Sequence, residues 1–599
     1  MPSGPLSLGD FPSEILDRIL DYVGYKGAIN LSRTSKGFYN TLYDEETGYW
    51  KREAQRVFKT PHVDSLINKV PWRYLFQGMA KAHVYTWGLD EDERLGHDRS
   101  PPKNYKRSSS SVAVPFEILR LRDKFVVDIV GGGWSTSFLT SDGHVYISGR
   151  LSEYMGMEET SATEIKFPEP ISQLSSGRDH LIALSSKGRV YTCIDKSQGA
   201  QRVKFSVMAS DSDSGYLTPD KIGRVTEDIG WVKKVVGGWD RCAALISGIG
   251  IVVWRPTDTG DTDPGAYTPS LRVIRGTNYL DKPPKGIPAE ALVEVQKHKS
   301  IGQVLDFTLG EGYLVFLTVT GKVFAVRFNQ EFDQAVPVEL VHFSSPEGQS
   351  PVNRISGNFR KFAVLNKEGV VRLGGVDIVR NCVAGKTKRV KPIRRPDFAS
   401  YKIVDIAFGD HHGLALTDEG EILSWGAESL MCGCLGLGDQ LPGMGKGKFT
   451  DLEVIKPKVV SFRPPGEDAG SSEGEDKAKY YAFNIAAAGW HSGALVLGLD
   501  EDHARGDDGA PEGSTLEVND DPTQIPDPPD LGFDPEALGS GGRERGHRGI
   551  RGVTSASFSA RGGMSRGGFV RSGLQGLSLF SPSNVPEDIP KYTAQRNIS

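Results

Sequence analysis

The chain has 599 residues, more than one hydrophobic core usually organises, so its length predicts two to four domains. Its net charge of −5 argues against nucleic acid or a membrane surface as the main partner, and its five cysteines are too few and uneven in number for a disulfide framework. It opens without a secretory signal pattern and contains no apolar run of membrane-spanning length, so we expect a cytoplasmic and/or nuclear protein.

The first predicted unit covers residues 8–58. Pro12 stands where a helix would start, because its missing N–H costs nothing there, and Asp10 precedes it as a candidate cap. A second short helix is expected around 28–38, and Trp50 closes the unit. Apolar residues recur at helical spacing in the first helix: Ile15, Leu16, Ile19, Leu20 and Val23. This stripe is either the core of the unit or a surface that a partner helix completes.

The order of these residues resembles the F-box. Phe-Pro at 11–12 replaces the usual Leu-Pro, S-E-I-L-x-x-I-L-x-Y-V follows at 13–23, and L-S-R-T-S-K-G-F and Y-W-K stand where later helices of that family lie. The F-box binds a Skp-type adaptor, which bridges to a cullin ubiquitin ligase. The resemblance therefore implies adaptor contacts from six residues: Phe11, Pro12, Ile15, Leu16, Ile19 and Leu20.

Residues 59–82 are predicted to link this all-α unit to the next domain. Within them "VPWRYLFQGMAKA" (70–82) is typical of a short amphipathic helix.

A repeat fills residues 83–499. "IVGGGWSTSFLTSDGHVYISG" (129–149) has the same order of apolar run, glycine, apolar run, glycine turn and apolar run as "GDHHGLALTDEGEILSWG" (409–426). Such a pattern predicts three short antiparallel strands per copy, joined by glycine hairpins. There are seven copies: 129–149, 174–193, 235–254, 307–326, 355–375, 404–426 and 485–498.

The two ends of this region complement each other. Residues 83–98 resemble the end of a repeat without its beginning, and 485–498 resemble a beginning without an end. Joined, they would form one sheet from both ends of the domain and close a ring of seven sheets with no long exposed edge. We therefore expect an all-β seven-bladed propeller.

These repeats resemble the propeller of the regulator-of-chromosome-condensation family, through fragments of Gly-x-x-His-x-x-Ala-Leu-x-x-x-Gly-x-Val/Ile-Tyr/Trp. The histidine position holds His180 and His412 in two copies. In the other copies it holds Ser135, Arg241, Tyr313, Arg360 and Ser492. The founding member of that family is a nucleotide exchange factor for a small GTPase, but a fold does not transfer an activity. No residue of this sequence is identified as carrying that exchange activity.

Several residues resemble a chemical site. His411 and His412 are adjacent on a predicted strand and so point to opposite faces, which disfavours a shared metal. Cys432 and Cys434 lack a second ligand pair at zinc spacing, and the sequence has no G-x-S-x-G motif and no P-loop. We therefore expect structural roles for these residues, and no catalytic residue, metal or cofactor.

A basic segment, "KTKRVKPIRR" (386–395), is the sharpest local charge cluster. It is either a solvated loop or a contact for an acidic partner, nucleic acid or a nuclear-import receptor. Its cations are Lys386, Lys388, Arg389, Lys391, Arg394 and Arg395.

Residues 500–599 are first acidic and proline-rich, then rich in Arg and Gly. Such compositions bury too little apolar surface to offset the entropy lost on ordering, so the segment is predicted to be a disordered tail.

An F-box followed by this propeller resembles the SCF-associated factor type of fungal F-box protein. The resemblance implies a non-catalytic substrate receptor of a Skp–cullin–F-box ubiquitin ligase, with the adaptor, through it cullin, and a target protein as partners. No membrane or nucleic-acid partner is expected. The alternative is a guanine-nucleotide exchange factor or a chromatin-binding propeller.

Overall fold

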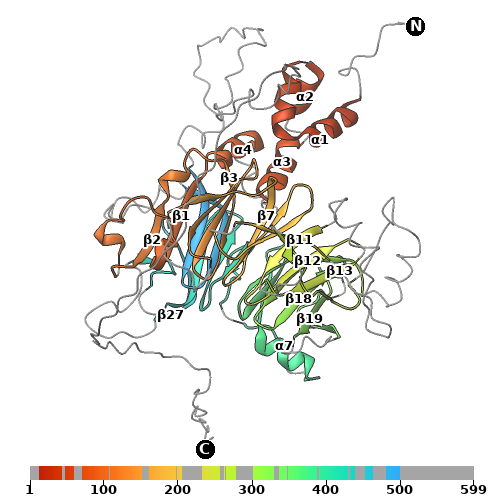
Figure 1. Ribbon diagram of the computed structural model, residues 1–599, viewed down its shortest axis with the longest axis vertical. Helices are drawn as coiled ribbons and strands as arrows, with labels where there is room; N and C mark the ends of the chain where they lie inside the picture. The colour runs from red at the N-terminus through yellow and green to blue at the C-terminus, as the bar shows by residue number, and fades with distance from the viewer. Residues whose placement is uncertain are drawn as a thin grey trace, which may run out of the picture. The chain divides into compact units, whose positions relative to one another are not determined.

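A computed structural model shows the fold of this protein (Figure 1). The chain divides into one compact unit over residues 1–523 and a second over 524–599. The structure describes these residues: 12–34, 36–43, 48–59, 71–106, 108–151, 161–196, 199–205, 232–247, 249–256, 262–263, 265–277, 301–328, 336–346, 348–386, 390–394, 396–428, 432–438, 452–462 and 480–498. The predicted tail and Asp10 lie outside them.

Four helices precede the first strand: α1 (Ser13–Ser32), α2 (Lys36–Tyr43), α3 (Tyr49–Phe58) and α4 (Trp72–Ala80). Pro12 immediately precedes α1, as predicted, and its carbonyl accepts the first helical hydrogen bonds. Gly24 interrupts α1 with a φ of 68°, a conformation that costs a glycine little. The second expected helix is therefore two pieces, the end of α1 and α2.

These helices share one apolar core with the sheets that follow. Leu16, Leu20 and Phe38 belong to the same buried cluster as Phe125 and Phe483, which are propeller residues. A chain of aromatic contacts crosses the junction: the Phe58 ring lies 5.6 Å from Phe76, 5.3 Å from Phe125 and 5.4 Å from Phe483. Burial of rings of this size provides much of the attachment.

Seven sheets make up the described part of the propeller, confirming the repeat count. We number the blades in chain order, with the sheet that joins the two ends of the domain as blade 7. Blade 1 is β3 (Val126–Gly131), β4 (Ser135–Thr140), β5 (Val145–Gly149) and β6 (Thr163–Ile165). Blade 2 is β7 (Ile171–Ser176), β8 (Leu181–Ser185), β9 (Val190–Cys193) and β10 (Gln201–Val203), extended by β14 (Thr262–Asp263) and β15 (Ala266–Tyr267). Blade 3 is β11 (Val232–Gly237), β12 (Cys242–Ile246), β13 (Gly250–Trp254) and β16 (Arg272–Val273).

The remaining blades follow the same antiparallel order. Blade 4 is β17 (Val304–Gly310), β18 (Tyr313–Thr318), β19 (Val323–Arg327) and β20 (Val338–Glu339). Blade 5 is β21 (Val352–Asn358), β22 (Lys361–Asn366) and β23 (Val371–Gly375), followed by helix α7 (Val376–Val383). Blade 6 is β24 (Ile403–Phe408), β25 (His412–Thr417), β26 (Ile422–Glu428) and β27 (Leu452–Val459).

Blade 7 closes the ring, and its composition confirms the prediction from the two incomplete repeats. Its strands are β28 (Tyr480–Ala488), β29 (His491–Gly498), β1 (His83–Leu89) and β2 (Ser111–Glu117). β1 pairs with β29 over six consecutive residue pairs, from His83 with Val496 to Gly88 with His491. In Figure 1 the orange β1 lies beside blue strands from the far end of the domain.

The first strand of every blade carries a register shift near its start. In blade 1, for example, pairing slips between Val126 and Asp128. The residue that follows each shift is polar or charged. We call these seven residues the bulge ring: Asp128, Gln173, Lys234, Asp306, Arg354, Asp405 and Asn484.

The strand register corrects two positions of the repeat alignment. His412 of blade 6 immediately precedes Gly413, which pairs with Phe408 of the first strand. The equivalent residue of blade 5 is Lys361, next to Phe362, and that of blade 7 is His491, next to Ser492. Counting three residues from Gly357 and from Gly489 places Arg360 and Ser492 there, one residue off in each case, because the equivalents of Gly409 in these blades are Asn358 and Ala488.

Candidate functional site

The exposed side of α1 is the first candidate interaction surface. Tyr22 is 92% exposed, Ile15 40% and Val23 39%, unusual values for side chains of this kind. Ile19 lies between them on the same helix face and is partly exposed. We call Ile15, Ile19, Tyr22 and Val23 the α1 stripe.

The other sides of α1 are fixed to neighbouring elements. Leu16 is 3% exposed and Leu20 is fully buried, so both side chains support the stripe from within the core. The Arg52 guanidinium of α3 donates to Asp17 at 2.5 Å and to Asp21 at 3.1 Å. Packing on one side and this charge pair on another hold α1 in one orientation, with the stripe facing outward.

The six residues predicted to contact an adaptor are thus divided. Ile15 and Ile19 belong to the exposed stripe, Pro12 is exposed at the helix start, and Leu16 and Leu20 are internal. Phe11 lies outside the described residues. Tyr22 and Val23 were not among the six, although the spacing from Ile15 through Ile19 already indicates them at i+7 and i+8.

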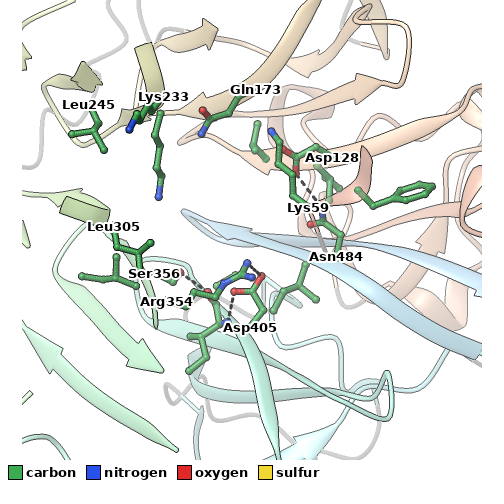
Figure 2. Close-up of a pocket in the computed structure, with 18 of the residues that line it drawn as sticks. Lys59, Asp128, Gln173, Lys233, Leu245, Leu305, Arg354, Ser356, Asp405 and Asn484 are labelled. Carbon is green, nitrogen blue, oxygen red and sulfur yellow. Dashed lines mark hydrogen bonds and ion pairs between the residues drawn. The ribbon is translucent and has the colours of Figure 1, made fainter. Parts of the chain in front are cut away.

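The second candidate is a cavity of about 620 Å³ along the inner strands of the propeller (Figure 2). First strands of all seven blades contribute to its wall, and Phe58 and Lys59 at the end of α3 line it as well. The Lys59 ammonium donates to the carbonyl of Ser172 at 2.8 Å, at the start of β7. One end of the four-helix unit therefore forms part of the cavity mouth.

The bulge ring connects neighbouring blades inside this cavity. Arg354 donates to Asp405 at 2.6 Å, Asn484 to Asp128 at 3.1 Å, and Lys234 forms an ion pair with Asp306. Figure 2 shows Arg354 directed at Asp405, and Asn484 beside Asp128. Each contact joins two blades that no backbone hydrogen bond of a sheet connects.

Backbone groups extend the same ring. The Gln173 amide donates to the carbonyl of Val235 at 3.2 Å and its oxygen accepts from the Val235 N–H at 3.2 Å. The Ile355 N–H donates to Asp306 at 3.3 Å. Blades 2 through 6 are linked in this way, and so are blades 7 and 1.

Burial governs the charges of the cavity. It raises the pKa of Asp128, which the Lys59 ammonium and the Asn484 amide oppose, and it raises the pKa of Asp405, which Arg354 opposes. Desolvation at the cavity wall, together with the neighbouring Lys234, lowers the pKa of Lys59, although its side chain is partly open to solvent. Because most of these charges already have a partner of opposite sign, the cavity is suited to holding blades together or to binding a polar group.

The suspected histidine site is architectural. His412 is fully buried, its Nε2 lies 2.8 Å from the Ser492 hydroxyl, and burial lowers its pKa to about 3. His411 points elsewhere and stacks on Trp490 with ring centroids 4.9 Å apart. Within the described residues, no group of three or more His, Cys, Asp or Glu side chains is arranged to hold a metal.

The cysteine pair is structural as well. Cys432 and Cys434 are buried in the apolar core between blades 6 and 7. The carbonyl of Cys434 accepts hydrogen bonds from the Trp87 indole at 3.0 Å and the Ser492 hydroxyl at 3.0 Å. The segment thus anchors the closing blade.

The basic segment begins just after α7, in blade 5. Lys386, Lys391 and Arg394 are exposed, and Lys388, Arg389 and Arg395 lie outside the described residues. Its role as a partner contact stays a prediction. Among the described residues no helix has the length and apolarity needed to span a membrane.

Comparison with known families identifies three segments of the chain. Residues 8–47 match the F-box domain, and residues 81–139 and 403–433 match the regulator of chromosome condensation (RCC1) repeat. The first match covers the unit that carries the α1 stripe, and the other two lie in the propeller.

Two curated proteins are similar to this chain in sequence. F-box protein pof9 of Schizosaccharomyces pombe is 23% identical over 81% of this chain and 89% of its own length. SCF-associated factor 1 of Saccharomyces cerevisiae is 22% identical over 57% of this chain, but the match spans only 45% of that protein. Among solved structures, Prp20p of Saccharomyces cerevisiae is 17% identical with a TM-score of 0.45, covering 72% of this chain and 96% of that one.

Proposed function

We propose that this chain, which carries an F-box and RCC1 repeats and is homologous to fungal F-box protein pof9 and SCF-associated factor 1, is the substrate-recognition subunit of a Skp–cullin–F-box ubiquitin ligase. The F-box would bind the Skp-type adaptor, and the propeller would hold the protein to be ubiquitinated. The subunit would act by proximity, without a catalytic residue of its own.

The observation that carries this proposal is the α1 stripe. Apolar side chains exposed in a row on a helix whose other sides are fixed indicate a docking surface for another protein. Ile15, Ile19, Tyr22 and Val23 supply that row in the F-box region.

The rigid junction supports the receptor role. The aromatic contacts of Phe58 with Phe76, Phe125 and Phe483 hold the F-box and the propeller in one shared core. A target bound to the propeller would therefore keep a defined position relative to the adaptor, which proximity-driven transfer requires.

Co-purification with a Skp-type adaptor tests the proposal. Ile15→Asp combined with Ile19→Asp places two charges in the stripe, and we expect binding to fall at least tenfold, since about 1–3 kcal/mol is lost per desolvated charge. Leu16 is left unchanged, because a charge at that buried position would unfold the F-box itself.

Val341→Asp is the matched control, an exposed apolar residue of the propeller at 64% exposure. It should bind the adaptor like the unchanged protein. If the double α1 variant keeps its melting temperature and still binds the adaptor fully, the proposed function is wrong. Faster nucleotide release from a small GTPase, with no adaptor binding, would instead favour an exchange factor.

A further inference from the structure

The propeller has a face that points away from the F-box. Lys59 contacts Ser172 at the start of β7, and Tyr25 lies 3.4 Å from Ser141, which directly follows the end of β4. The first strands therefore start on the F-box side. The turns between first and second strands lie at the other end, on what we call the far face.

Four planar side chains stack in order on the far face. The Arg178 guanidinium lies 4.9 Å from the Trp134 ring and 4.2 Å from the Trp239 ring. Trp239 in turn stacks on Phe359, with centroids 4.1 Å apart and planes 28° from parallel. All four are partly exposed and come from the turns of blades 1, 2, 3 and 5. We call them the ladder.

Phe359 holds its place in the ladder in an unfavourable backbone conformation. Its φ is 51°, in the left-handed region that bulky residues rarely adopt. The turn is held by hydrogen bonds from the Glu311 N–H to the Phe359 carbonyl at 2.6 Å and from the Val376 N–H to the Arg360 carbonyl at 2.9 Å. Strain that the surroundings enforce in this way clusters at binding sites and active sites.

Positive charge gathers around the ladder. At the turns, second-strand starts and third-strand ends of blades 2 to 5, the described cations outnumber the carboxylates: Lys196, Arg178, Arg241, Arg255, Arg327, Arg360 and Lys361 against Asp179, Asp195, Asp240, Glu311 and Asp377. The Arg241 guanidinium also lies 5.2 Å over the Phe328 ring. Lys386 and Lys391 of the basic segment follow α7, whose first N–H bonds to this same turn.

The stacking determines which groups of the ladder can contact a ligand. Trp239 already contacts both the Arg178 guanidinium and the Phe359 ring, so part of its ring surface is taken up within the ladder, while ring edges and guanidinium N–H groups stay available at the surface. Aromatic edges are electropositive, and the edge of a guanidinium carries its N–H donors. Nucleic-acid bases bind aromatic side chains through open ring faces, and the contacts within the ladder take up part of those faces. Carboxylates bind such edges well.

We infer that the far face over blades 1 to 5 is the target-binding surface, and that it takes an extended acidic segment of the target protein across the ladder. This inference rests on the proposed function and names the target class for it. Trp and Arg are the residues that most often dominate such interfaces, and a stack that is already assembled loses little entropy on binding. The acidic residues around blade 7, Asp90 to Glu93, mark the part of this face that such a segment would avoid.

Fluorescence anisotropy on the full chain in complex with its adaptor tests the inference. The probe is a fluorescein-labelled peptide of Glu, Asp, Gly and Ser, with its Gln, Asn, Gly and Ser counterpart and a single-stranded DNA of equal charge as comparisons. We expect the acidic peptide to bind more tightly than both, with an affinity that falls as salt rises. Arg178→Glu should weaken binding about tenfold or more.

Two further variants separate binding from folding. Phe359→Gly suits the positive φ, so the protein should melt no lower than before while binding of the acidic peptide weakens at least about threefold. Arg360→Glu reverses a charge that is 50% exposed and should also weaken binding. Lys367→Glu, a reversal at an exposed residue of the β22–β23 hairpin on the F-box side, should leave binding unchanged.

The outcomes can be told apart in the same preparations. Equal binding of the acidic and neutral peptides, or equal losses with Lys367→Glu and Arg360→Glu, overturns the inference while adaptor binding leaves the proposed function standing. Tighter binding of the DNA, lost in Phe359→Gly, overturns it in favour of a nucleic-acid surface. Ladder-dependent peptide binding without adaptor binding supports the surface and refutes the ligase role.

Discussion

At the scale of single residues, the repeat signature Gly-x-x-His has a steric origin. A Cβ atom on Gly409 would lie 2.1 Å from the His412 ring, and one on Gly177 would lie 2.1 Å from the His180 ring. The imidazole fills the space that any other side chain at the glycine would need. In blades 2 and 6 the glycine is therefore required by the buried ring three residues later.

The buried His412 should make stability depend on pH. Burial lowers its pKa to about 3 in the folded protein, whereas the unfolded chain binds the proton near the ordinary value of about 6.5. Above pH 6.5 both states are neutral there and nothing is lost. As pH falls below 6.5 the unfolded state gains protons first, so the folded state loses up to about 1.4 kcal/mol per pH unit from this group.

His412→Gln removes that contribution. Urea unfolding at pH 7 and pH 5 should show that wild type loses more stability than the variant by about 1–2 kcal/mol, because other titrating groups are common to both proteins. His144→Gln is the control, an imidazole that is 51% exposed. Parallel pH dependences for wild type and His412→Gln would contradict a neutral buried imidazole.

At the scale of elements, adjacent blades are held by two kinds of contact. Apolar clusters fill the space between blades, such as the one that joins Val235 of β11 with Ile182 of β8. The bulge ring adds polar contacts at the inner strands, where a shift in register turns one polar side chain per blade toward the next. The inner strands of neighbouring blades are thus held together by apolar packing and by the polar contacts of the bulge ring.

Breaking one of these polar contacts should cost more than an exposed ion pair does. Asp405→Ala leaves the Arg354 guanidinium, which it contacts at 2.6 Å, without its carboxylate in the cavity. We expect the free energy of unfolding to fall by about 1–3 kcal/mol, measured by urea denaturation. Asp377→Ala removes an ion pair with Arg380 on the exposed helix α7 and should cost less than about 0.5 kcal/mol.

A double variant completes this test. Arg354→Met with Asp405→Leu replaces both charges by apolar groups of similar size and should recover most of the lost stability. If Asp405→Ala lowers the free energy of unfolding no more than Asp377→Ala does, the bulge ring adds no stability beyond the apolar packing.

At the scale of the whole molecule, one sheet built from both ends of the domain determines whether the ring closes. β29 lies between β28 and β1, so removal of β28 and β29 would leave β1 and β2 without their partners in blade 7. The F-box shares its core with the same blade through Phe483 and Leu497. Ring closure and F-box attachment therefore depend on the same strands.

Two truncated chains, one without β28 and β29 and one with them, test whether blade 7 is needed for closure. A chain ending at residue 479 should lose cooperative unfolding and expose apolar surface, seen as dye binding, because an opened sheet edge leaves its ladder unpaired. A chain ending at residue 498 should melt within a few degrees of the full protein. A cooperative transition in the shorter chain would show that blade 7 is not needed for closure.

The sequence predicts the architecture more completely than the surfaces. Seven copies and two incomplete ends predict the closed ring because each short sheet needs neighbours on both faces, and Pro12 with its stripe predicts α1. The inner or outer side of that stripe could not be assigned, since Leu16 and Ile15 are equally apolar and only packing separates them. The ladder escaped detection because nothing in the sequence shows that side chains from turns of different blades, such as Trp134, Arg178 and Phe359, come together in space.

Closure by β29 also sets the order in which the protein becomes competent on the ribosome. The F-box region emerges early, and at about 5–20 residues per second the strand that completes the ring follows roughly tens of seconds later. A nascent or prematurely terminated chain therefore carries the F-box region with its α1 stripe but no finished propeller. Only translation through β29 completes the propeller beside the F-box, so under the proposed function a chain that stops before this strand would bind the adaptor without being able to present a target.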